Sequence, residues 1–336
     1  MKTSTIKRFV SVAVAALLLT TGLESCHRRE LSYTDVAEID VIADWSRSGL
    51  SARESNYGAT VVFFPTDGGQ PTVVLMGDRN GKTVRLPEGT YDVLLFNRTF
   101  EDFDNIGFRG HDRYHTLEAH LREDVRGADS RVVTEGPDEL AADRREGFTV
   151  SQSMLGNYTR SRLARVGADT RADENRYELL MSPTTLTYTL EVIVNIKGLS
   201  NIHKAECSLT GMPESVYMHS GRPSDKTVEH RFDLASPRYE DGSTANGSLS
   251  STITVFGFDE TIASAHLRAL LTDGKTIFED DLDHTKIRRV NRDDGSVRII
   301  VEFDCPTTVP TVSGPSSGFD ADVNDWSGEE NHEIDI

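Results

Sequence analysis

The segment 186–197, LTYTLEVIVNIK, decides the fold class more directly than any other part of the chain. Side chains of a β-strand point alternately to its two faces, so apolar residues at every second position predict one buried and one solvated face. Such strands are typical of antiparallel sheets and sandwiches. One face carries Leu186, Tyr188, Leu190, Val192, Val194 and Ile196; the other carries Thr187, Thr189, Glu191, Asn195 and Lys197, with Ile193 as the exception.

Shorter strands are predicted on both sides of this segment. They cover 39–41, 59–65, 72–76 and 91–95 before it, and 228–234, 251–258, 266–271 and 297–303 after it. Turn sequences separate several of them, namely Asp67-Gly68-Gly69, Asp273-Gly274 and Asp294-Gly295. Asn80-Gly81 predicts a further tight hairpin, because both residues tolerate positive φ.

Residues 109–176 differ from the rest, because they carry many charges and few large apolar side chains. Leu117, Leu121 and Val125 recur every four residues, which leaves short helical turns open. We expect a long charged excursion from a first sandwich. About 310 residues beyond the leader exceed one typical core. The predicted fold is therefore all-β, with two tandem β-sandwich domains at 36–182 and 183–336.

The N-terminus predicts export and lipidation. Lys2, Lys7 and Arg8 precede an apolar run at 9–19, which is far shorter than the roughly 20 residues needed to span a bilayer. Leu23-Glu24-Ser25-Cys26 follows and resembles a bacterial lipobox, whose cysteine thiol takes a diacylglyceryl group, although Glu24 departs from the usual pattern. We predict a signal peptide at 1–25, lipidation of Cys26 and a tether at 26–35. Ordinary secretion with a chance cysteine is the alternative.

The net charge excludes one class of function, and the remaining cysteines leave two structural alternatives. The net charge is −18, and removal of three basic residues and Glu24 with the leader makes it −20, which excludes nucleic-acid binding by counterion release. With Cys26 lipidated, Cys207 and Cys305 remain. In an oxidising compartment they form either one disulfide or two separate buried thiols.

Weak chemical motifs are present, but none predicts a catalytic residue, a metal or a cofactor. His111, His115 and His120 have partly helical spacing without the HExxH order, which favours solvated histidines. Asp320, Asp322 and Asn324 imitate an EF-hand loop that has Asp325 where glycine is required. Two acidic clusters, at 101–104 and 279–281, are expected by chance in a chain with 54 acidic residues. The aromatic residues Trp45, Phe63, Phe64, Tyr91 and Phe96 lie in alternating strands, so we expect core packing rather than a ligand-stacking surface.

Several local sequences together resemble the fimbrial anchor (FimB-like) and fimbrillin-like surface lipoproteins of Bacteroidetes. These sequences span nearly the whole chain beyond the leader. They are Cys26 followed by Arg28-Arg29-Glu30-Leu31, Asp44-Trp45-Ser46, PEGTYDVLLFN at 87–97, GLSNI at 198–202, LTGMPES at 209–215, VFGF at 255–258 and GFDADVNDW at 318–326.

This resemblance implies two tandem transthyretin-like (immunoglobulin-like) sandwich domains at the outer membrane. It also implies a non-enzymatic role as an anchor or accessory subunit of a type V fimbria, with fimbrillin-like partners bound by strand addition. Stalk subunits are also exported as lipoproteins, so anchor and stalk both stay open. The alternative is a glycan-binding surface lipoprotein of a polysaccharide-uptake system. Such a protein needs an exposed aromatic platform, so burial of Trp45 and Trp326 would count against it.

Overall fold

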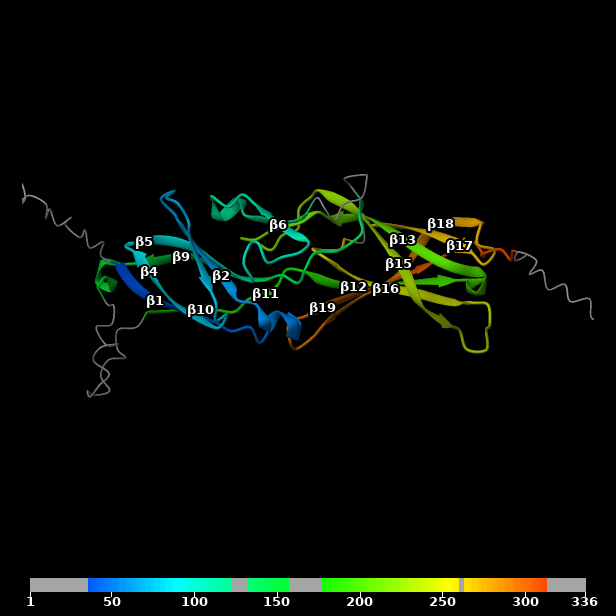
Figure 1. The fold of residues 1–336 in the computed structure, drawn as a ribbon, viewed down its shortest axis with the longest axis horizontal. Coiled ribbons are helices and arrows are strands. Elements are labelled where there is room, and N and C mark those ends of the chain that lie inside the picture. The colour runs from blue at the N-terminus through cyan, green and yellow to red at the C-terminus, as the bar shows by residue number, and fades with distance from the viewer. Residues whose placement is uncertain (1–35, 123–131, 157–176, 260–262, 313–336) are drawn as a thin grey trace, which may run out of the picture.

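The computed structural model describes residues 36–122, 132–156, 177–259 and 263–312 (Figure 1). Strands dominate these residues, which confirms the all-β prediction. The helical elements among them are short 3-10 turns: η1 (Ala52–Asn56), η2 (Tyr114–Thr116), η4 (Gln152–Met154) and η6 (Leu199–Asn201). No helix in this part of the chain is long and apolar enough to cross a membrane.

The first half contains two facing sheets. One has the order β10-β1-β4, and the other has the order β11-β9-β5-β2-β3. A small core lies between them and includes Ile39, Val41, Phe63 and Leu95. The strands are β1 (Val36–Ala43), β2 (Ala59–Pro65), β3 (Thr72–Met76), β4 (Gly81–Pro87), β5 (Gly89–Asn97), β9 (Ala141–Val150), β10 (Tyr177–Met181) and β11 (Thr184–Thr185).

The two predicted turns in this half have different outcomes. β2 and β3 pair antiparallel across the turn that contains Asp67-Gly68-Gly69, so that hairpin is confirmed. The hairpin predicted at Asn80-Gly81 is wrong, because β3 and β4 belong to different sheets. The chain there crosses from one layer of the sandwich to the other.

The predicted charged excursion also contains regular strands. β7 (Glu118–Leu121) lies in it and pairs with β6 (Ile106–Arg109), which precedes it, and with β14 (Ser215–Tyr217) of the second half to form a small sheet. β8 (Val132–Val133) also lies in it and joins another sheet. Leu117 and Leu121 are buried, but Leu121 lies in a strand, so the helical spacing there is not realised. β9 lies inside the five-stranded sheet between β11 and β5. Its charged middle, Asp143 to Glu146, is half-buried or exposed, which explains its polar sequence.

The second half forms a closed ring of seven strands, in the order β13-β17-β18-β19-β12-β16-β15 with β15 pairing back to β13. Two long strands turn the corners, and each has a register shift where it passes from one neighbour to the next. The ring strands are β12 (Tyr188–Ile196), β13 (Ile202–Pro213), β15 (Thr227–Tyr239), β16 (Gly247–Val255), β17 (Ser264–Leu271), β18 (Ile277–Asn291) and β19 (Val297–Asp304).

The two halves share one large apolar core. It runs from Phe64 and Phe96 in the first half to Leu190 and Val301 in the ring. Strand β8 of the first half pairs with β15, and β7 pairs with β14. The division into two tandem domains near residue 182 therefore stays a prediction, since packing crosses that point. Figure 1 places the start of β1 and the chain after β19 at opposite ends of an elongated molecule.

Candidate functional site

The predicted lipidation site, Cys26, lies outside the described residues, as do Trp326 and the EF-hand-like Asp320, Asp322 and Asn324. Lipidation therefore stays a prediction. The candidate features that the structure does describe are a groove beside Trp45, a set of buried charges at the junction of the two halves, and the free edges of the first sandwich.

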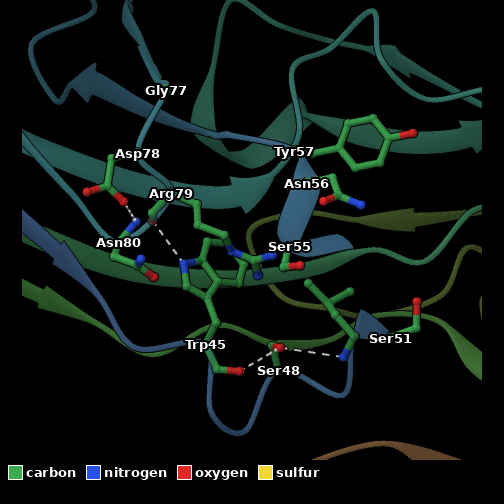
Figure 2. Close-up of a pocket in the computed structure, with 11 residues that line it drawn as sticks. Trp45, Ser48, Ser51, Ser55, Asn56, Tyr57, Gly77, Asp78, Arg79 and Asn80 are labelled. Carbon is green, nitrogen blue, oxygen red and sulfur yellow. Dashed lines mark hydrogen bonds between the residues drawn. The ribbon is translucent and has the colours of Figure 1, made fainter. Parts of the chain in front are cut away.

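The groove has a volume of about 450 Å³ and lies between the loop after β1, η1 and the turn from β3 to β4 (Figure 2). Trp45 is half-buried beside it, and its indole Nε1 donates a hydrogen bond to the Arg79 carbonyl at 2.9 Å. The Arg79 guanidinium carbon lies 4.3 Å from the centre of the Trp45 ring and covers it. Burial lowers the pKa of Arg79. Trp45 thus stabilises the turn from β3 to β4, and its ring is not an exposed platform.

A second group of polar side chains is buried where η1 meets β5. The guanidinium of Arg98 donates two hydrogen bonds to the Glu54 carboxylate, at 2.6 and 3.0 Å. Asn97 donates to the same carboxylate at 2.9 Å. Burial alone would lower the pKa of Arg98, but the hydrogen bonds and charge of Glu54 raise it. This fully paired cluster fixes η1 on the sheet and leaves no free charge for a ligand.

A third charged group ties the small sheet to the ring. Arg109 donates two hydrogen bonds to Glu118 and a third, at 3.3 Å, to Glu214. Ser215 also donates to Glu118. Burial opposes ionisation of Glu118, but these donors lower its pKa below the usual value. The arrangement is a structural clamp between the two halves.

The three candidate histidines do not converge. The His111 ring packs on Phe100, whereas His120 Nδ1 lies 2.9 Å from the Leu121 carbonyl oxygen. His115 packs instead against His219, with ring centres 5.1 Å apart. In the described parts of the chain, no three His, Cys, Asp or Glu side chains form a group that could hold a metal ion.

The disulfide alternative for Cys207 and Cys305 is not realised, because both thiols are free and buried. The Cys207 thiol donates to the Ser208 carbonyl, and the Cys305 thiol donates to Asp280 and to the Thr307 carbonyl. Burial raises the pKa of each thiol to about 12. The two cysteines are therefore separate, buried thiols of the core.

The three side chains of the acidic cluster at 279–281 interact with neighbouring strands and loops. Glu279 pairs with Arg268, Asp281 faces His266, and Asp280 accepts a hydrogen bond from the Thr307 amide.

The prediction that the aromatic residues pack in the core is confirmed for Phe63, Phe64, Tyr91 and Phe96, which are all buried.

The free strand edges lie in the first half. The ring strands pair on both sides, whereas β3 pairs with β2 alone among the described residues. β3 reads TVVLM, with no charge and no proline, and its Val73 and Leu75 side chains are 49% and 56% exposed. On β10, another edge strand, Leu180 is 60% exposed beside its register partner Ile42. Natural proteins usually protect such edges with charges or bulges. The sequence predicted β3 as a strand, but no local signal marked it as an edge.

The described residues thus form an all-β protein in which an open sandwich is joined to a closed ring of strands. Residues 25–233 match the model of the family described as Domain of unknown function (DUF5119), and the chain belongs to that family.

Three relatives give this family a context. A Bacteroides ovatus protein named fimbrium anchoring subunit Fim4B is 22% identical over 346 residues, covering 97% of both chains. A solved Bacteroides ovatus structure described as an adhesin is 18% identical, with a TM-score of 0.53 over 87% of this chain and 94% of its own. The fimbrial anchor protein Mfa2 of Porphyromonas gingivalis is 13% identical, with a TM-score of 0.40 over 79% and 95% of the two chains. The predicted resemblance to fimbrial anchor proteins is confirmed.

Proposed function

We propose that this chain is a non-enzymatic, lipid-anchored anchor or accessory subunit of a fimbria-like assembly at the cell outer membrane. The observation that carries the proposal is the similarity to the fimbrium anchoring subunit over almost the full length of both proteins. The adhesin of known structure supports the fold assignment alone. Two tandem transthyretin-like domains, divided near residue 182, are part of this proposal.

Cys26 is the proposed attachment point. A diacylated N-terminus would hold a chain of net charge −20 at a membrane without any basic surface. The test is labelling of the natively expressed protein with a palmitate analogue. We expect label on the wild type and on Cys305→Ala, and none on Cys26→Ala. Label that persists in Cys26→Ala would disprove the lipid assignment.

Strand addition at β3 is the proposed mode of partner binding. The unprotected backbone edge supplies hydrogen bonds, and the exposed Val73 and Leu75 supply apolar contact for a fimbrillin-like strand. We expect Leu75→Lys to reduce co-purification of fimbrial subunits without unfolding the protein. Ile277→Lys is the matched control, because Ile277 is similarly exposed on a ring strand. Equal recovery of partners with both variants would exclude β3 as the docking edge.

The glycan-uptake alternative is less well supported. It requires an exposed aromatic platform, whereas Trp45 is half-buried beneath the Arg79 guanidinium. The relative that matches over almost its full length is named a fimbrium anchoring subunit. We therefore favour the fimbrial role.

A further inference from the structure

The first and last strands of the described chain occupy interior positions in their sheets. β1 lies between β10 and β4, and β19 lies between β12 and β18. Each is therefore hydrogen-bonded along both of its edges, so extracting either strand requires two ladders to break. Protein strands at chain ends need not be placed in this way, since an end strand is equally able to pair on one side only.

Each of these two strands has one parallel neighbour. β1 pairs parallel with β10 from Ile39–Tyr177 to Ala43–Met181, and β19 pairs parallel with β12 from Thr189–Arg298 to Asn195–Asp304. Figure 1 places the start of β1 at one end of the long axis and the chain after β19 at the other. Tension between the two ends therefore pulls β1 and β19 outward, roughly along their own axes.

The two parallel neighbours are joined by a short covalent connection. β10 ends at Met181, and residues 182–187, which include β11, lead directly to the start of β12. Figure 1 shows β10, β11 and β12 following one another along the long axis. Under tension this connection pulls β10 from its C-terminal end and β12 from its N-terminal end, opposite to the pulls on β1 and β19.

Parallel strands pulled from opposite ends are loaded in shear. All hydrogen bonds of the ladder then share the load, whereas a perpendicular pull breaks them one after another. Local contacts extend both ladders: the Asp44 amide donates to the Met181 carbonyl at 2.8 Å, and the Cys305 and Val309 amides donate to the Asn195 and Lys197 carbonyls at 2.9 Å.

We propose that the fold has a load-bearing function, in which two parallel-strand clamps, β1–β10 and β12–β19, are joined by the connection at 182–187 and by the core that the two halves share. The proposed anchor function supplies the biological source of tension, but the mechanical property belongs to the chain alone. β1 has five register pairs with β10 and seven with β4, whereas β19 has seven with β12 and eight with β18, so the first half yields first. Its release lengthens the tether by about 500 Å for residues 36–181.

Single-molecule pulling tests this proposal on the full chain in a Cys26→Ser background. Handles at the two termini apply tension along the proposed path. Handles on Lys82→Cys and Glu178→Cys, on the exposed surfaces of β4 and β10, pull the three-stranded sheet apart sideways. The buried Cys207 and Cys305 are shielded from the coupling chemistry. Equal urea midpoints of the two proteins verify that both are folded alike.

We expect the end-to-end rupture force to be several-fold higher than the sideways one at the same loading rate. Asp44→Pro removes the amide that donates to the Met181 carbonyl and so shortens the β1–β10 ladder, which lowers the end-to-end force. A short Gly-Ser insertion at the exposed Gly242 turn is the control and leaves that force unchanged. Equal forces in the two pulling directions, or no effect of Asp44→Pro, would overturn the proposal. Failure to recover fimbrial subunits from cells would instead refute the proposed function and leave these forces unaltered.

Discussion

Acid destabilisation through His230 follows from its position inside the ring. His230 lies in β15 on the same face as Val228, Phe232 and Leu234, and its side chain is 3% exposed. Burial penalises the charged imidazolium and lowers the pKa of His230 from 6.5 to about 4. The folded protein thus holds this imidazole neutral at pH values where the unfolded chain protonates it.

The sign and size of the effect follow from this difference. Because the folded pKa is depressed for a base, the contribution to stability is complete above pH 6.5 and is lost as the pH falls toward 4. Between pH 7 and pH 5 the free energy of unfolding falls by about 2 kcal/mol from this group alone. Most carboxylates are still ionised at pH 5, so they contribute little over the same range.

Urea unfolding at pH 7 and pH 5 measures the effect. His230→Leu replaces the titrating imidazole with an apolar side chain of similar size. The free energy of unfolding of this variant is therefore expected to change much less between the two pH values. His203→Leu, at an exposed position of β13, is the control and should match the wild type. The reasoning is refuted if the wild type loses no stability, or if His230→Leu loses as much as the wild type.

Two further changes are tested by chemical denaturation, one at a contact between the halves and one inside the first half. Gly295 has φ +86, and a Cβ there would overlap the Arg47 carbonyl oxygen, so Gly295→Ala is expected to lower the free energy of unfolding by about 2–3 kcal/mol. Gly242→Ala is the control: Gly242 has φ +78 in open space, so the loss should be about 1 kcal/mol. Equal losses for the two variants would contradict the contact with Arg47. Glu54→Gln removes the closer of the two carboxylates that pair with the buried Arg98 and leaves Asp138 at 3.5 Å, so it is expected to cost about 3 kcal/mol. Asp225→Asn breaks an exposed pair with Arg222 and should cost under about 1 kcal/mol. A loss for Glu54→Gln no larger than that of Asp225→Asn would argue against the buried cluster.

The parts of the fold that the sequence predicts are strands with one or both faces buried. β12, β2 and β5 have inward residues at every second position or a continuous apolar run, because one or both of their faces are buried. The turn between β2 and β3 needs glycine, since Gly68 has φ +89. Local sequence therefore carries enough information for these elements.

Other strands give no such signal. β18 has fourteen intermediate or exposed positions around the buried Leu282 and turns a corner of the ring, so its charged sequence does not show the alternation of a half-buried strand. β9 has an equally polar middle although it lies inside a sheet. The edge position of β3 depends on which strands pair elsewhere, as does the meeting of Glu54 with Arg98 across 44 residues. These features arise from long-range pairing, which periodicity within a segment does not encode.

Recovery of partners from native membranes tests the central claim most directly. The protein would be isolated by affinity from outer-membrane fractions of cells that express it from its own promoter, and its partners would be identified by mass spectrometry. Our account predicts that fimbrial subunits accompany the wild-type protein in this fraction. It also predicts that Cys26→Ala is lost from the membrane. Isolation of the membrane-bound protein without any fimbrial subunit would contradict the account.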